Sequence, residues 1–155
     1  MNAIAMVIAT AGYVGLFPIA SGTAGSLAGL GVFAFVRWIG VPALELATIA
    51  VVLILGIWSA SVAERTLNLK DPGPVVIDEV LGMLITLALL PLSIGGVLAG
   101  FVLFRLCDVI KPFPAARLES MHGGMGIMLD DAVAGLYAHL SLRVLVAIAP
   151  AWLAA

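Results

Sequence analysis

The sequence predicts an all-α membrane protein, a small polytopic helix bundle with some short or re-entrant helices. Hydrophobic residues make up 63% of the 155 positions and charged residues only 10%, and the mean hydropathy is +1.23. Such a chain lies mostly in a bilayer, where each segment must satisfy its own backbone hydrogen bonds. The alternation of apolar and polar residues that a membrane β-barrel requires is absent. The length allows one domain, residues 1–155.

Glycine, proline and charged residues divide the apolar sequence into six stretches. The clearest, 43–62, is long enough to cross about 30 Å of hydrocarbon as a helix, at about 1.5 Å per residue. The fourth and fifth stretches are too short for a full span, so they either extend through the neighbouring acidic residues or form a hairpin that dips partway. The first, interrupted by Pro18, is expected to be re-entrant or to lie along the surface. The predicted helices are 3–14, 24–39, 43–62, 80–90, 97–106 and 127–149.

Helix packing gives two further expectations. The small residues Gly25 with Gly29, and Gly96 with Gly100, are spaced so that another helix can approach closely. His139 lies within the last apolar stretch, where we expect it to pack or to form an interhelical hydrogen bond.

Charge and cysteine content exclude several classes of function. The formal net charge is −2, and the seven basic residues are too few and too dispersed for a nucleic-acid surface. A single cysteine, Cys107, excludes an internal disulfide framework and a CxxC metal site. The sequence has no basic region before its first apolar stretch, so it does not resemble a cleaved signal peptide. It also lacks a P-loop, a GxSxG elbow and an HExxH motif.

Six of the nine acidic residues form three short islands along the chain. An ionised carboxylate near hydrocarbon costs several kcal/mol unless it is paired, hydrated or bound to a cation. Carboxylates at helix starts also gain from the helix dipole, but this does not explain two adjacent acidic pairs together with two further aspartates. Clustered oxygen ligands favour a hard divalent cation such as Mg²⁺. The islands are Asp71 with Asp78 and Glu79, Asp108, and Asp130 with Asp131.

The distribution of basic residues predicts that these islands meet at one membrane face. If the apolar stretches cross in alternating directions, most Lys and Arg residues lie in loops on one side, and Arg37 is the exception. The positive-inside rule makes that side the cytoplasm. The acidic islands and the glycine-rich segment 15–26 fall on the same side. The loop residues concerned are Arg65, Lys70, Arg105, Lys111 and Arg117.

Several residues near the acidic islands could bind phosphate. Residues 21–26 open the second apolar helix, where glycines and free N–H groups suit an anion, although capping by Ser21 or Thr23 explains the segment equally well. Arginine offers a fork for phosphate oxygens and lysine a point charge, although Lys111 could instead extend to lipid headgroups. A histidine in the following loop could shuttle a proton or simply be solvated. The candidates are Gly22, Thr23, Gly25, Ser26, Arg105, Lys111 and His122.

Four segments resemble the motifs of the phosphatidylglycerophosphatase A family, in order and spacing, from about residue 12 to 135. Two positions depart from the family pattern: Ser21 stands where a second proline is usual, and Cys107 where an aromatic or aliphatic residue is usual. Neither departure removes an acidic residue. The segments are GLFPIASGTAGSL (15–27), KDPGPVVIDEVLGM (70–83), FRLCDVIKPFP (104–114) and HGGMGIMLDD (122–131).

The resemblance implies a Mg²⁺-dependent phosphatase of the bacterial inner membrane that converts phosphatidylglycerophosphate to phosphatidylglycerol and phosphate. In that reading Asp78, Glu79, Asp130 and Asp131 bind one or two Mg²⁺ ions, and Asp71 and Asp108 complete or orient the shell. The metal would activate a water for attack on phosphorus, with Arg105 and Lys111 neutralising charge on the phosphoryl group. Alternatively, Asp108 could act as the nucleophile.

A non-enzymatic alternative is a cation-binding membrane protein, such as a channel or carrier subunit. It predicts acidic residues at several depths across the bilayer, whereas here they cluster at helix ends. A CDP-alcohol phosphotransferase needs a DGxxAR…GxxxDxxxD pattern, which is absent. The predicted partner is a phospholipid substrate, with no nucleic acid, and the sequence leaves open whether the protein forms a homo-oligomer.

Overall fold

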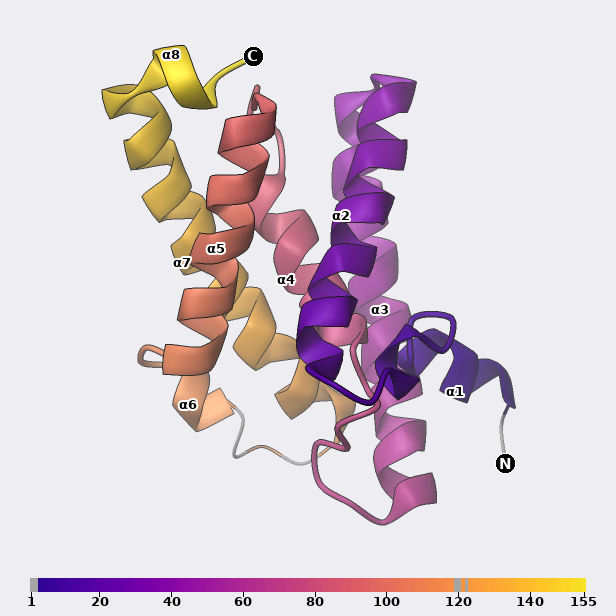
Figure 1. Ribbon diagram of the computed structural model, residues 1–155. Coiled ribbons are helices and arrows are strands. Elements are labelled where there is room, and N and C mark those ends of the chain that lie inside the picture. Colours follow the sequence, from indigo (N-terminus) through magenta and orange to yellow (C-terminus); the bar gives the residue numbers. More distant parts are fainter. Residues whose placement is uncertain (1–2, 119–120, 122) are drawn as a thin grey trace.

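The computed structural model describes residues 3–118, 121 and 123–155. This part of the chain is helical (Figure 1), apart from turns and one isolated bridge between Leu92 and Ala154, as the sequence predicted. The helices are α1 (Ala3–Ala9), the 3₁₀ helix η1 (Val14–Leu16), α2 (Ser21–Ile39), α3 (Pro42–Leu67), α4 (Ile77–Leu87), α5 (Ile94–Ile110), α6 (Ala115–Leu118), α7 (Gly124–Ile148) and α8 (Pro150–Leu153).

Three helices in the described part, α2, α3 and α7, are long and apolar enough to cross a membrane. The protein is therefore an integral membrane protein. Of the two short stretches, α4 has 11 residues and begins one residue before Asp78. Helix α5 has 17 residues and runs past Cys107 and Asp108. The structure thus matches the alternative in which both helices extend through the acidic residues, and α4 remains too short to span a bilayer.

The N-terminal segment differs from the predicted helix 3–14. Helix α1 ends at Ala9, because Ala11, Gly12 and Tyr13 all have positive φ angles, which an α-helix cannot accommodate. Helix α2 begins at Ser21, three residues earlier than predicted. Its N-cap is Ala20, and no side chain caps it. The alternative in which Ser21 or Thr23 caps this helix is therefore wrong.

Helix α4 forms the centre of the bundle (Figure 1). Nine of its 11 residues are buried, and it packs mainly against α7 and α2. Gly25 and Gly29 allow the contact with α2, since a Cβ at Gly29 would lie 2.8 Å from Met83 Cβ. On the other side, a Cβ at Gly135 would lie 2.6 Å from the Gly82 carbonyl oxygen. The predicted role of small residues in close helix approach is confirmed for Gly25 with Gly29. It is also confirmed for Gly96 with Gly100, since a Cβ at Gly96 would collide with the Leu153 carbonyl oxygen of α8 and one at Gly100 would lie 2.6 Å from Leu87 Cδ2 of α4.

The far end of α4 is held by an ion pair in which Glu45 is buried and Arg37 is partly exposed. Arg37 Nε lies 3.0 Å from Glu45 Oε1. Glu45 also accepts the backbone N–H of Leu89 at 2.8 Å, and Arg37 donates to the Leu90 carbonyl oxygen at 2.9 Å. These bonds satisfy backbone groups just beyond the C-terminus of α4. Arg37, the exception to the charge pattern of the loops, therefore has a structural role.

Candidate metal and phosphate site

The starts of α2, α4 and α7 and the end of α5 meet at one end of the bundle, the lower end in Figure 1. Their meeting brings the acidic islands together as predicted. The ligand oxygens of Asp78, Glu79 and Asp131 all lie within 4.8 Å of one another. We call these three residues the carboxylate cluster. Residues from α4 and α7 that are more than 50 positions apart in sequence thus share one site.

The carboxylate cluster has the properties expected of a cation site. Asp78 and Asp131 are only 8% and 4% exposed. Within the described part of the chain, Asp78 Oδ1 and Glu79 Oε2 are buried and have no hydrogen-bond donor. Buried carboxylate oxygens without donors are strongly unfavourable unless a cation meets them. The donor set therefore fits a hard divalent ion, which prefers carboxylate oxygens.

Burial raises the pKa of Asp78 well above its usual range, and the charges of Glu79, Asp131 and Asp71 raise it further. Burial also raises the pKa of Glu79; the charge of Asp108 adds to this effect, and that of Arg105 opposes it. Without a cation these groups cannot all stay ionised at such short separations. A bound cation would remove the repulsion and favour the ionised forms.

A guanidinium group lies beside the carboxylate cluster. Arg105 of α5 forms an ion pair with Asp108 at 2.7 Å and donates to the hydroxyl of Ser26 at 3.4 Å. A Cβ at Gly22 would collide with the Glu79 carboxylate and lie 3.1 Å from Arg105 Nη1. Gly22 therefore leaves the space in which the acidic and basic groups approach each other. The arrangement can hold a phosphate ester between a cation and an arginine.

The remaining predicted metal ligands have different surroundings. Asp130 binds Lys111 through an ion pair of 2.9 Å, and it accepts the backbone N–H of Asp131 at 2.9 Å. Asp71 is exposed in the loop before α4, and its charge acts on Asp78. Neither belongs to the carboxylate cluster. Asp108 forms an ion pair with Arg105, and its side chain also interacts with Asp131 of the carboxylate cluster through its charge and a hydrogen bond.

The predicted phosphate-binding segment forms the first turns of α2. The first N–H groups of a helix have no intrahelical acceptor, so those of Ser21, Gly22 and Thr23 are available to an anion. Ser26 is fully buried, and its hydroxyl donates to the Gly22 carbonyl oxygen at 2.9 Å. Gly25 packs against Val76 at the start of α4. The candidate His122 lies outside the described residues.

One positioning residue was missed from the sequence. The Ser61 hydroxyl accepts the backbone N–H of Gly124 at 2.9 Å and donates to the Ile57 carbonyl oxygen at 2.6 Å. A Cβ at Gly124 would also collide with the Ile57 carbonyl oxygen. Ser61 thus attaches the start of α7, and with it the acidic pair, to α3. The only sequence signal was the glycine pair 123–124, which gives no indication of its partner.

Several known proteins are similar to this chain over most of its length. The sequence matches the profile of the family Phosphatidylglycerophosphatase A over residues 7–146. It is 40% identical over 129 residues to phosphatidylglycerophosphatase A of Escherichia coli, covering 79% of this chain and 72% of that protein. The corresponding Haemophilus influenzae protein is 41% identical over 128 residues, covering 80% and 77%.

A third relative carries a different name. A Bacteroides thetaiotaomicron protein, provisionally named a phosphatidylinositol-3-phosphatase, is 36% identical over 142 residues, which cover 84% of this chain and 86% of that protein. No solved structure matches the fold.

Proposed function

Because the chain belongs to the phosphatidylglycerophosphatase A family, we propose that it hydrolyses phosphatidylglycerophosphate to phosphatidylglycerol and phosphate in a Mg²⁺-dependent reaction. The observation that carries the proposal is the buried carboxylate cluster, whose unpartnered oxygens lie next to Arg105 at the ends of membrane helices. A lipid substrate held in the bilayer would present its phosphate at this level. We take the whole chain as one phosphatase domain.

The residues that would hold Mg²⁺ are Asp78, Glu79 and Asp131, with Asp71 and Asp130 at the edge of the site. When bound, Mg²⁺ supplies Lewis-acid polarisation of the phosphoryl group and a water of lowered pKa. The guanidinium of Arg105 donates hydrogen bonds to the phosphoryl oxygens and neutralises the charge that develops on them. Asp108 orients that guanidinium through their ion pair.

The other phosphate-binding candidates act around this centre. The free N–H groups at the start of α2 bind a phosphate oxygen, and the small side chain at Gly22 keeps the approach open. Lys111 forms an ion pair with Asp130 and so helps to position the adjacent Asp131. In a covalent route, the Asp108 carboxylate would attack phosphorus and displace phosphatidylglycerol, and water would then attack the phosphorus of the aspartyl phosphate, releasing phosphate and the free carboxylate. Borohydride reduction of a trapped aspartyl phosphate, which converts the aspartate to homoserine, would identify that route.

We also propose that the site faces the cytoplasm of the bacterial inner membrane. Support comes from the charges at the end of the bundle that carries the carboxylate cluster. Arg65, Lys70, Arg105, Lys111 and Arg117 all lie at that end or in its loops, as the positive-inside rule requires of a cytoplasmic face.

A second candidate substrate is phosphatidylinositol 3-phosphate. The name of the Bacteroides thetaiotaomicron relative suggests this substrate, and the alignment of the two proteins covers most of each chain. Both substrates are lipid phosphomonoesters, so the same carboxylate cluster would serve. The non-enzymatic alternative is less well supported, because the carboxylate cluster lies at helix ends rather than along a path through the bundle.

Phosphate release by purified protein in mixed micelles tests the proposal. We expect release from phosphatidylglycerophosphate with Mg²⁺, loss of release in EDTA, and recovery when Mg²⁺ is restored. Phosphatidylinositol 3-phosphate, compared at equal surface concentration, decides between the two substrates by their kcat/KM values. Failure to release phosphate from either lipid, by protein that binds Mg²⁺, would favour the non-enzymatic alternative.

A further inference from the structure

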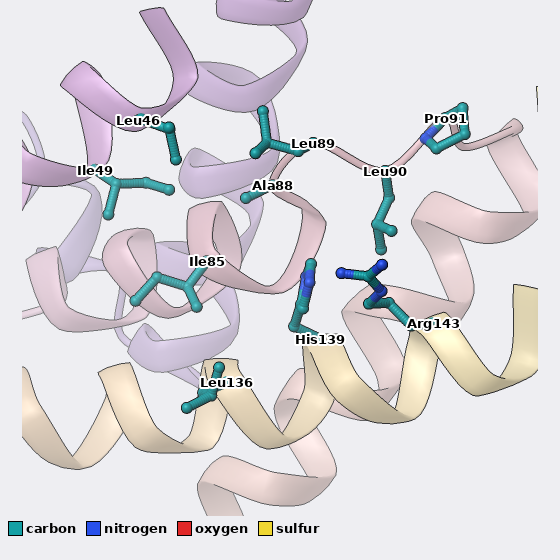
Figure 2. A pocket seen from close by; sticks show the side chains of 10 residues that line it. All are labelled: Leu46, Ile49, Ile85, Ala88, Leu89, Leu90, Pro91, Leu136, His139 and Arg143. Atoms are coloured by element: carbon teal, nitrogen blue, oxygen red, sulfur yellow. The ribbon is translucent and has the colours of Figure 1, made fainter. Parts of the chain in front are cut away.

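A second polar site lies at the opposite end of α4 from the carboxylate cluster. A cavity of about 420 Å³ opens between α3, α4 and α7. Figure 2 shows apolar side chains on three sides and two polar ones, His139 and Arg143, pointing towards the segment that follows α4. Leu46 and Leu136, at the rim, are about half exposed. The apolar lining comprises Leu46, Ile49, Ile85, Ala88, Leu89, Leu90, Pro91 and Leu136.

Arg143 is too far from the carboxylate cluster to belong to it. It follows Asp131 by 12 residues on the same continuous helix, which at about 1.5 Å per residue is a separation of about 18 Å. It precedes the end of α7 at Ile148 by only five residues, within reach of the opposite membrane interface for an arginine side chain. The cavity therefore lies in the half of the bundle opposite to the carboxylate cluster, where the Arg143 side chain can reach lipid headgroups.

Arg143 has no counter-charge within the described part of the chain: no ion pair or hydrogen bond involves its side chain. Arg37, at the same end of the bundle, differs because it pairs with Glu45. Among these three side chains, the charges of Arg37 and Glu45 cancel, and the positive charge of Arg143 faces the cavity. An arginine in a membrane helix is costly unless it meets an anion or water, so the charge selects an anionic occupant.

His139 offers a second polar contact one turn before Arg143, on the same face of α7. Its Nδ1 lies 3.1 Å from the Thr86 carbonyl oxygen. A carbonyl can only accept, so Nδ1 must carry the proton, and in the neutral ring Nε2 is then an acceptor. The expected interhelical hydrogen bond of His139 is thereby confirmed. An acceptor beside an arginine suits a ligand with both an anionic group and a hydroxyl.

The wall of the cavity that faces these groups is fixed in place. Leu89 and Leu90 are held through their backbone by Glu45 and Arg37. The cavity is consequently preformed rather than dependent on a mobile loop, which lowers the entropic cost of binding a ligand.

We propose that this cavity binds one anionic phospholipid of the opposite leaflet. Its phosphodiester pairs with Arg143, a headgroup hydroxyl donates to His139 Nε2, and an acyl chain lies along Leu46, Ile49 and Leu136. The lipid could be the product of the proposed reaction or another anionic lipid of the membrane. The shared chemistry is a phosphodiester in a headgroup of net negative charge, together with an acyl chain. The inference does not depend on the proposed phosphatase activity.

Native mass spectrometry of the full chain in detergent tests this inference. EDTA is present throughout, so that no cation bridges lipid to the carboxylate cluster. Phosphatidylglycerol, phosphatidylserine and phosphatidylcholine are added in separate arms. The variants are Arg143→Gln, Arg143→Lys as the charge-conserving form, and Leu136→Trp, which fills the cavity. Arg65→Gln is the matched control, because it removes the same charge from the last turn of another spanning helix.

Wild-type protein should retain one anionic lipid in preference to phosphatidylcholine. Arg143→Gln should weaken anionic-lipid binding about tenfold or more, as expected for loss of a charged hydrogen bond, whereas Arg143→Lys and Arg65→Gln should bind like wild type. Leu136→Trp should lose the bound lipid. Preference for phosphatidylglycerol over phosphatidylserine would identify the hydroxyl contact with His139; equal binding would identify a general anionic-lipid site.

Two results would overturn the inference. One is equal retention of phosphatidylglycerol by Arg143→Gln and Arg65→Gln proteins, which would reduce Arg143 to a side chain that merely reaches the interface. The other is a dimer that Leu136→Trp dissociates while lipid retention is unchanged, since the occupant would then be a second copy of the chain. Circular dichroism of each variant establishes that the helical bundle is intact.

Discussion

Lys111 Nζ lies 2.9 Å from Asp130 Oδ2, and the other carboxylate oxygen of Asp130 accepts the backbone N–H of Asp131 at 2.9 Å. Lys111 is the C-cap of α5, so this ion pair ties the end of α5 to the start of α7. Its partner Asp130 immediately precedes a member of the carboxylate cluster. We therefore infer that Lys111 positions Asp131 and does not simply anchor the protein to lipid headgroups.

Lys111→Met should destabilise the protein, because the Asp130 side chain, only 6% exposed, would keep a buried charge without its partner. Adding Asp130→Asn should recover most of that loss, since the unpaired charge is then removed. Melting temperatures of the single and double variants in detergent measure the coupling. Purely additive losses would show that the two side chains do not depend on each other. Lys111→Arg, which keeps the ion pair, should stay close to wild type.

Asp78→Asn and Asp131→Asn should each reduce turnover to less than about a tenth of wild type, because each removes one oxygen ligand of the carboxylate cluster. Asp71→Asn is the matched comparison: Asp71 is exposed and lies outside the cluster, so it should retain more activity. Isothermal titration with Mg²⁺ should show the same order. If both cluster variants bind Mg²⁺ and turn over substrate like wild type, the metal assignment is wrong.

Gly22→Ala should lower activity, because its new methyl group would collide with the Glu79 carboxylate and crowd Arg105. Gly31→Ala is the control in the same helix. A Cβ there meets nothing within 4 Å, and the gain in helix propensity should leave stability equal or slightly higher. Initial rates and melting temperatures of both variants separate a local effect on the site from an effect on α2. Equal activity of the Gly22→Ala and Gly31→Ala variants would show that Gly22 does not contribute to the site.

Arg105→Lys should cause a large fall in kcat, because lysine keeps the charge but loses the bidentate geometry needed for a phosphoryl group. It would also lose the geometry of the bonds to Asp108 and Ser26. Kinetics in mixed micelles separate kcat from KM. A kcat near that of wild type would show that Arg105 does not bind the phosphoryl group, and that role would then be assigned to the N–H groups at the start of α2.

The sequence predicted the class of the fold and the meeting of the acidic islands, because hydropathy and helix direction determine both. It could not assign a partner to each carboxylate. Asp130 and Asp131 are adjacent, yet one pairs with Lys111 and the other joins Asp78 and Glu79. That division depends on the rotation of α7 about its axis, which is set by packing such as the contact between Gly135 and Gly82.

Two other features were beyond a pattern-based prediction. Helix α1 ends early because Ala11, Gly12 and Tyr13 adopt the left-handed backbone conformation. Among these residues only Gly12 is of a type that indicates this conformation from sequence, since Ala11 adopts it against its own preference. The cavity beside Arg143 was missed because its significance depends on Arg143 having no ion-pair partner in the described part of the chain. Only a three-dimensional structure shows which groups lie near the Arg143 side chain.

Asn68→Cys and Leu118→Cys, each in a Cys107→Ser background, should react only with reagents that reach the cytoplasm. Both positions lie at the end of the bundle with the carboxylate cluster, just after α3 and at the end of α6, among the positive charges that favour the cytoplasm. Trp38→Cys is the control at the opposite end, where the native side chain is 83% exposed, and an impermeant maleimide applied to whole cells with a permeable outer membrane should label it. Labelling of position 68 or 118 under the same conditions would place the carboxylate cluster on the outer face. The proposed substrate would then have to reach the site after crossing the membrane.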